Sequence, residues 1–224
     1  MTSAVEVSFN DFVDYLNAYS VSGLLSKKEL VDSLKGVHKR IYALICWQIE
    51  LSRGKKEGYR VWLNESVSDL IQILPLLVQG YYKACAAMHR SAIENFVRFV
   101  VANGGKDPNA IQSTPDLFDT AKALARTDPE LATRLSLLRQ GYTNLCNYVH
   151  SAGKPYCTFA EALKEYPAFD PQALDTVVKE LVRSIRAMNG YLLLIKAPQF
   201  ASMFHANRDA VLDVLTPSEK RLIV

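Results

Sequence analysis

The stretch Leu76–Val101, LLVQGYYKACAAMHRSAIENFVRFVV, decides the fold class. Its apolar residues occupy nearly all sides of a helix, which is typical of a helix at the centre of a protein. The pattern stops at Asn103–Gly104–Gly105, a strong signal for a helix C-terminus. Pro75 comes directly before it, and we expect this proline to kink or break the helical run that begins near Trp62.

Apolar residues at helical spacing on both sides of this stretch predict further helices. The long ones cover roughly residues 30–53, 62–74, 128–149 and 170–196, and the short ones cover roughly residues 9–16, 116–126 and 209–215. Asp128–Pro129 and Asp170–Pro171 each combine a capping acid with proline at the first helical position. No run alternates as a strand does. We therefore predict an all-α fold, with residues 1–224 forming a single helical bundle of four to five long helices and short accessory helices.

Composition supports this fold class and says little about activity. Of 224 residues, only 10 are glycine and 9 are proline, which favours long helices over a fold with many turns. Hydrophobic residues at 49% and charged residues at 22% exclude wholesale disorder. A net charge of +3 is too small to indicate nucleic-acid binding by itself.

The four cysteines predict a reducing compartment. Cys46, Cys85, Cys146 and Cys157 form no CxxC pair, and we expect buried free thiols. The N-terminus lacks the basic start and apolar run of a signal peptide. The longest uncharged stretch, Leu70–Tyr82, is shorter than the roughly 20 residues of a membrane span. These features predict a cytoplasmic protein that does not interact with membranes.

Motifs of the common enzyme classes are missing from the sequence. It has no phosphate loop and no GxGxxG, GxSxG or HExxH pattern. Its carboxylates form no ExxH pair of the di-iron kind, and only four histidines are present. We expect no metal and no other cofactor.

The first polar insertion in an apolar helix is His89–Glu94. Arg90 and Glu94 are four residues apart, so they share a face and are able to pair, although the acid follows the base in the weaker orientation. A charged pair in so apolar a helix is costly to bury unless it is well bonded. It is therefore either a structural network that ties the bundle together or a polar site between helices.

The second insertion is Tyr142–Ser151. Tyr142 and His150 lie on or near one helix face, and Asn144 and Asn147 lie on another. His150 falls in the last turn, where the helix dipole favours the protonated ring. It is either a candidate acid or base, or a helix-end residue bonded to a neighbouring carboxylate.

Two other features are expected to be solvated. His38 falls on the polar side of its helix. The basic residues between Lys27 and Lys56 give the same helix a moderately positive face, which is typical of a solvated surface and otherwise of contact with RNA or an acidic partner.

The two insertions together resemble HEPN-like helical domains, including the phage-defence branch that is similar to abortive-infection proteins. Those domains pair an Arg-x-x-x-Glu helix with a helix that ends in Tyr-x-x-(x)-Val-His. The matching segments here are Gly80-Tyr81-Tyr82 with Met88–Glu94, and Tyr142 with Asn147–His150. The resemblance covers about residues 76–151.

The resemblance implies a metal-independent ribonuclease that is usually dimeric, with Arg four to six residues before His on one helix. In that chemistry His acts as acid or base on the ribose 2′-hydroxyl, and Arg stabilises developing phosphate charge. This sequence departs from the motif, because Asn144 stands six residues before His150 and Arg139 stands eleven before it. Arg90 on the facing helix is the remaining candidate for the cation.

The candidate catalytic residues are therefore His150, Arg90 and Asn144, with Glu94, Tyr142 and Asn147 as a supporting polar network. The first hypothesis is a HEPN-like protein of a prokaryotic defence or toxin–antitoxin system that cleaves RNA without a metal. The alternative is a non-catalytic helical module that binds a protein partner. Expected partners are a second copy of the chain, an antitoxin or defence-complex subunit, and RNA.

Overall fold

The predicted all-α class is confirmed. The computed structural model describes residues 3–18, 25–53, 58–153 and 169–221, and every regular element in these ranges is a helix. The long helices are α3 (Lys28–Ser52), α4 (Arg60–Val78), α5 (Tyr82–Asn103), α7 (Pro129–Val149) and α8 (Pro171–Ile195). The short ones are α1 (Ala4–Ala18), η1 (Pro108–Ala110), α6 (Thr114–Leu124), α9 (Ala197–Ala201), α10 (His205–Leu212) and α11 (Pro217–Lys220).

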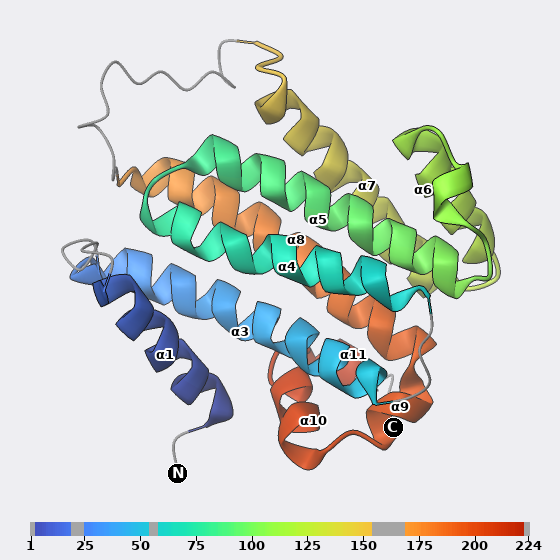
Figure 1. The fold of residues 1–224 in the computed structure, drawn as a ribbon, viewed down its shortest axis with the longest axis horizontal. Helices are drawn as coiled ribbons and strands as arrows, with labels where there is room; N and C mark the ends of the chain where they lie inside the picture. Colours follow the sequence, from blue (N-terminus) through green and yellow to red (C-terminus); the bar gives the residue numbers. More distant parts are fainter. Residues whose placement is uncertain (1–2, 19–24, 54–57, 154–168, 222–224) are drawn as a thin grey trace.

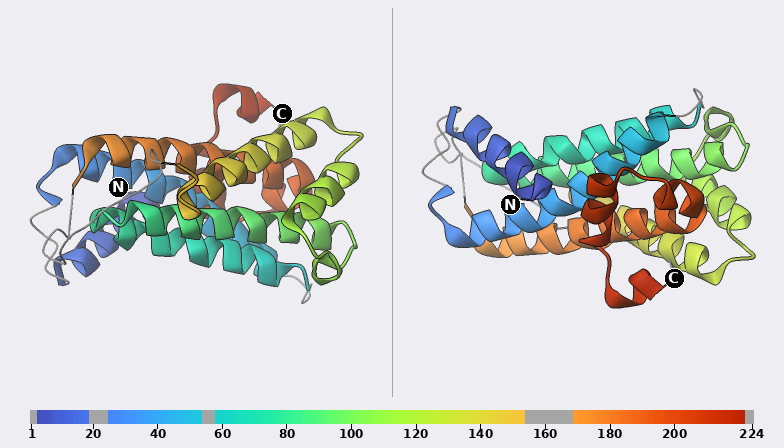
Figure 2. Two further views of the ribbon diagram at one scale, coloured as in Figure 1. Left: turned by 90° about the horizontal axis from the view of Figure 1, so that it is seen from above. Right: turned by 90° about the horizontal axis from the view of Figure 1, so that it is seen from below.

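The long helices form a closed bundle. Packing runs from α3 to α4, α5, α7 and α8 and back to α3, and α5 also touches α8 across the centre. Helices α3, α5 and α8 run in one direction, whereas α4 and α7 run in the opposite direction (Figure 1). The N-terminal α1 lies against α3, and α9 and α10 cover the side formed by α3 and α8 (Figure 2).

The core lies where these helices meet, and α5 is central to it as predicted. The largest fully buried side chains include Trp47 on α3 and Phe96 and Phe99 on α5. Full burial of one large apolar side chain contributes about 1.5–3 kcal/mol. Much of the stability of the bundle therefore depends on the middle of α3 and α5.

The break between α4 and α5 does not lie at Pro75, so the predicted break there is wrong, and the alternative of a kink stays a prediction. Helix α4 continues through Pro75 to Val78. The chain turns at Gly80, which has a φ of 73°. The Tyr81 N–H donates to the Leu76 carbonyl at 3.0 Å and the Gly80 N–H donates to Leu77 at 3.2 Å, the two bonds of a Schellman motif. Glycine adopts the left-handed conformation required here without the steric cost of a Cβ atom.

His38 is buried, which contradicts the expectation that it is solvated. Helix α1 covers it with Phe9 and Phe12, and the ring of Tyr42 lies on its other side. His38 Nε2 lies 3.1 Å from the hydroxyl of Ser8. The prediction is wrong because α1 packs on this part of α3 and covers the ring.

The described cysteines are free thiols, as expected. Cys46 and Cys85 are buried, and burial raises the pKa of each thiol to about 12. Cys146 is half-buried, and Cys157 lies outside the described residues.

In the part of the chain that the structure describes, α4 is the single helix long and apolar enough to cross a membrane. Half of its apolar window is buried inside the bundle, and the core helix of a soluble protein meets the same criteria.

Candidate functional site

Arg90 joins α5 to α7 through Tyr142. Its Nε donates a hydrogen bond to the Tyr142 hydroxyl at 3.2 Å, and the guanidinium lies 5.3 Å from the centre of the Tyr142 ring. This hydrogen bond is the main reason that the pKa of Arg90 is raised, and the charge of Glu94 adds a smaller contribution. The structure therefore brings together one pair from the predicted polar cluster.

Glu94 pairs with Arg98, so the expected ion pair between Glu94 and Arg90 is not formed. Arg98 Nη2 lies 2.9 Å from Glu94 Oε1, and the hydroxyl of Thr114 donates to Glu94 Oε2 at 3.4 Å. The guanidinium of Arg98 also lies 5.3 Å from the centre of the Trp62 ring. These contacts connect α5 to α4 and to the start of α6.

His150 lies at the end of α7, away from Arg90. It is the C-cap residue and is exposed, with no side-chain hydrogen bond to any described residue. It follows Tyr142 by eight residues, or about 12 Å along the axis at 1.5 Å per residue. The next residue, Ser151, has a φ of 48°, and its hydroxyl lies 2.7 Å from Lys83 Nζ. Lys83 therefore contacts the residue that follows His150, whereas Arg90 contacts Tyr142, two turns earlier on α7.

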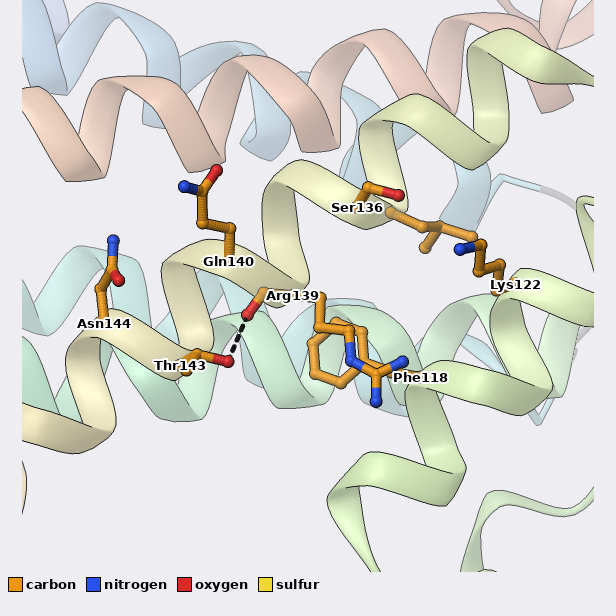
Figure 3. A pocket seen from close by; sticks show the side chains of 8 residues that line it. Phe118, Lys122, Ser136, Arg139, Gln140, Thr143 and Asn144 are labelled. Carbon is orange, nitrogen blue, oxygen red and sulfur yellow. Dashed lines mark hydrogen bonds between the residues drawn. The ribbon is translucent and has the colours of Figure 1, made fainter.

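Asn144 lines a different space from both of these residues. It belongs to a hollow of about 380 Å³ between α6 and α7, together with Arg139 and Gln140 (Figure 3). Arg139 lies over the ring of Phe118 there and pairs with Asp119. Residues six apart on a helix are separated by about 120° around its axis, so Asn144 and His150 face different sides.

Asn147 does not extend the cluster. Its side chain is half-buried and forms no hydrogen bond with the residues that the structure describes. Its backbone carbonyl accepts the Ala152 N–H at 2.9 Å, which closes the C-terminal turn of α7. Of the six predicted site residues, only Arg90 and Tyr142 thus contact each other through their side chains.

Two buried polar contacts were missed from the sequence. Between α4 and α5, Asn95 donates to the buried carboxylate of Asp69 at 3.0 Å, and Ser66 donates to the Ala92 carbonyl at 2.8 Å. Ser66 and Asp69 are three residues apart, and their place on the apolar face of α4 was the available signal.

A third missed contact joins α7 to the C-terminal helix. Arg134 Nη1 lies 3.0 Å from Glu219 Oε1, and both side chains are 10% exposed. The guanidinium packs on Gly190, where an added Cβ atom would lie 2.0 Å from Arg134 Nη1. No local pattern links residues so far apart in the sequence.

Among the described residues, no group of three or more His, Cys, Asp and Glu side chains could hold a metal ion. Comparison with protein-family models, with curated proteins and with solved structures gives no match to this chain.

Proposed function

We propose that this protein is a non-catalytic helical interaction module, in which the Arg90–Tyr142 contact stabilises the fold. One observation carries this proposal: Arg90, Asn144 and His150 do not share a common space. Arg90 is engaged by Tyr142, Asn144 lines the hollow beside α6, and His150 lies two turns beyond Tyr142. Acid–base catalysis on RNA requires the proton-transfer group and the charge-stabilising group at the same phosphodiester.

The HEPN-like resemblance is part of the same proposal. The resemblance favours a protein of a prokaryotic defence or toxin–antitoxin system that acts in the cytoplasm. Its partner is then a second copy of the chain, an antitoxin or a defence-complex subunit. Asn144 stands where the family's Arg is expected. Asparagine can donate a hydrogen bond but cannot neutralise phosphate charge, which favours binding over cleavage. Light scattering on the purified protein tests for the homodimer.

The second candidate function, a metal-independent ribonuclease, is favoured by the exposure of His150. Its ring is accessible to a substrate, and Lys83 supplies a positive charge at the adjacent residue Ser151. In this alternative, Lys83 takes the phosphate-stabilising role that the sequence suggested for Arg90.

A cleavage assay separates the two functions. Labelled tRNA is incubated in EDTA with the wild-type protein, His150→Ala and Lys83→Ala. We expect all three to give the same background, because no residue of the set is catalytic. Cleavage by the wild type that is lost in His150→Ala overturns the proposal and establishes the ribonuclease.

Thermal unfolding tests the structural role of the α5–α7 contact. Tyr142→Phe removes the hydroxyl that accepts from Arg90, and we expect the free energy of unfolding to fall by about 0.5–1.5 kcal/mol. For a chain of this size that corresponds to a drop in Tm of a few degrees, about 2–4 °C per kcal/mol. His150→Ala is the matched control on the same helix and should melt with the wild type. An unchanged Tm for Tyr142→Phe contradicts the structural role.

A further inference from the structure

A second groove lies between α7 and α8, on the other side of α7 from the hollow beside α6. Its volume is about 460 Å³. Four aliphatic side chains contribute to its lining: Leu137, Val178, Val182 and Ala187. Four basic side chains contribute as well: Arg134, Lys179, Arg183 and Arg186. The groove is thus apolar and positively charged.

One carboxylate of the chain is already bound in this groove. Glu219 of α11 is its only acidic lining residue among those described, and Arg134 holds it from α7. The other oxygen of Glu219 accepts the Thr216 N–H at 2.8 Å and the Thr216 hydroxyl at 2.7 Å. Helix α11 lies over the side of the bundle formed by α7 and α8 (Figure 2). The groove therefore recognises a carboxylate presented by a short helical turn.

The remaining basic residues are only partly neutralised. Lys179 pairs with Asp175 at 2.6 Å, and Arg183 donates to Gln140 and lies 4.0 Å from Glu180. Arg186 forms no hydrogen bond or ion pair with any residue in the described ranges. Its charge also acts on Arg40 of α3, whose pKa is lowered first by burial and then by Arg186. Positive charge is therefore left uncompensated along α8.

We propose that the α7–α8 groove binds an acidic, partly apolar segment of a partner protein. The carboxylates of this partner segment lie at Arg183 and Arg186, beside the site that Glu219 occupies. The aliphatic side chains of the segment cover Val178 and Val182. This inference rests on the proposed interaction function and names the class of partner. A protein segment fits better than RNA, because a phosphate backbone would contact the arginines and leave the aliphatic lining exposed to water.

Fluorescence anisotropy with defined probes tests the groove. The main probe is a labelled peptide of about 15 residues that carries Glu and Leu on one helical face. The comparison probes are the same peptide with Lys in place of Glu, oligoglutamate, and oligouridylate. We expect binding of the Glu/Leu peptide, weaker binding of oligoglutamate, and no binding of the Lys peptide.

Paired variants locate the binding surface. Arg183→Glu with Arg186→Glu should weaken binding of the Glu/Leu peptide at least about tenfold, as charge reversal at the centre of an interface does. Arg183→Gln with Arg186→Gln should weaken it less and guards against loss of folding, which circular dichroism checks. Lys106→Glu with Arg126→Glu is the matched control, because it changes net charge equally at exposed positions outside the groove.

Three results overturn the inference: no binding of the Glu/Leu peptide, equal weakening in the control variant, or tighter binding of oligouridylate that depends on Arg183 and Arg186. The last result assigns the groove to RNA. None of these results contradicts the proposed interaction function, provided that the tRNA assay shows no His150-dependent cleavage. Conversely, His150-dependent cleavage of tRNA contradicts the proposed non-catalytic function, but it does not change the measured binding of the Glu/Leu peptide to the groove.

Discussion

His89 is a buried histidine that the fold keeps neutral. It is 1% exposed, its Nε2 has no hydrogen-bond partner among the residues that the structure describes, and burial lowers its pKa from 6.5 to about 3. Below pH 6.5 the unfolded chain binds a proton at this position that the folded chain does not bind. The free energy of unfolding therefore falls as the pH drops from about 6.5 towards 3, by up to about 1.4 kcal/mol per pH unit. Burial also lowers the pKa of His38, which acts in the same direction.

Chemical denaturation of His89→Leu between about pH 6 and pH 4 measures this contribution. The variant should show a shallower loss of stability with falling pH than the wild type, because leucine binds no proton in either state. His205→Ala removes an exposed histidine and should keep the wild-type slope. Equal slopes for His89→Leu and the wild type would show that His89 is protonated in the folded state.

Gly190 is required by the guanidinium that packs on it. An alanine there would place a Cβ atom 2.0 Å from Arg134 Nη1, and the ion pair with Glu219 restrains the guanidinium from moving away. We expect Gly190→Ala to lower the free energy of unfolding by about 1–3 kcal/mol, as overpacking does. Gly36 on α3 is the control, since a Cβ atom there would meet Arg40 Nη1 at an ordinary 3.7 Å.

Gly36→Ala should raise stability by up to about 1 kcal/mol, because alanine is the better helix former. Urea denaturation of the two variants measures both effects. If Gly190→Ala is as stable as Gly36→Ala, Arg134 moves without cost and the Arg134–Glu219 contact does not hold α11.

The ion pairs of α5 show how far residue spacing predicts partners. Arg90 and Arg98 both lie four residues from Glu94, but only Arg98 follows the acid, the orientation that the helix dipole favours. The structure forms the Glu94–Arg98 pair, so this choice was available from the sequence. The partner of Arg90 was not, because Tyr142 is 52 residues away and reaches it only through the packing of α7.

At the scale of the element, helix boundaries marked by local capping residues were the most predictable. The side chains of Asp128 and Asp170 cap α7 and α8 as the Asp-Pro pairs predicted, because these signals are local. The end of α4 was placed too early, since a proline in the last turn leaves little of the helix to disrupt. At α11, Thr216 and Glu219 form a capping box from a Thr-x-x-Glu pattern that was overlooked.

Substitutions at Pro75 and Gly80 test which residue separates α4 from α5. Pro75→Ala restores an N–H donor inside α4 and should leave stability unchanged or raised. Gly80→Ala forces a Cβ atom into the left-handed region and should lower the free energy of unfolding by about 1–2 kcal/mol. Thermal unfolding of both variants is the measurement. If Pro75→Ala lowers stability and Gly80→Ala does not, the proline and not the glycine separates the two helices.

At the scale of the whole molecule, the chain combines a closed bundle with peripheral helices. The described part of α1 contributes two buried apolar side chains, Val5 and Phe9, whereas α5 is buried along most of its length. The sequence predicted the bundle because its long apolar patterns persist over many turns. It could not predict the covering of α3 by α1 or the docking of α11 on α7, because both depend on contacts between residues distant in the chain.

This division predicts a gradient of local stability. Amide hydrogens open with free energies that approach the global value in the core and fall towards zero in weakly packed elements. We expect the middle of α5, around Phe96 and Phe99, to exchange most slowly in native-state hydrogen exchange followed by mass spectrometry. Helix α1 should exchange fastest among the helices that carry buried side chains. Its protection factor, which corrects for the slower intrinsic exchange at low pH, should fall on acidification, because His38 must lose its contacts with α1 to bind a proton. Protection of α1 equal to that of α5 at neutral pH would contradict this gradient, and would mean that something outside the described contacts, such as a second copy of the chain, covers that face.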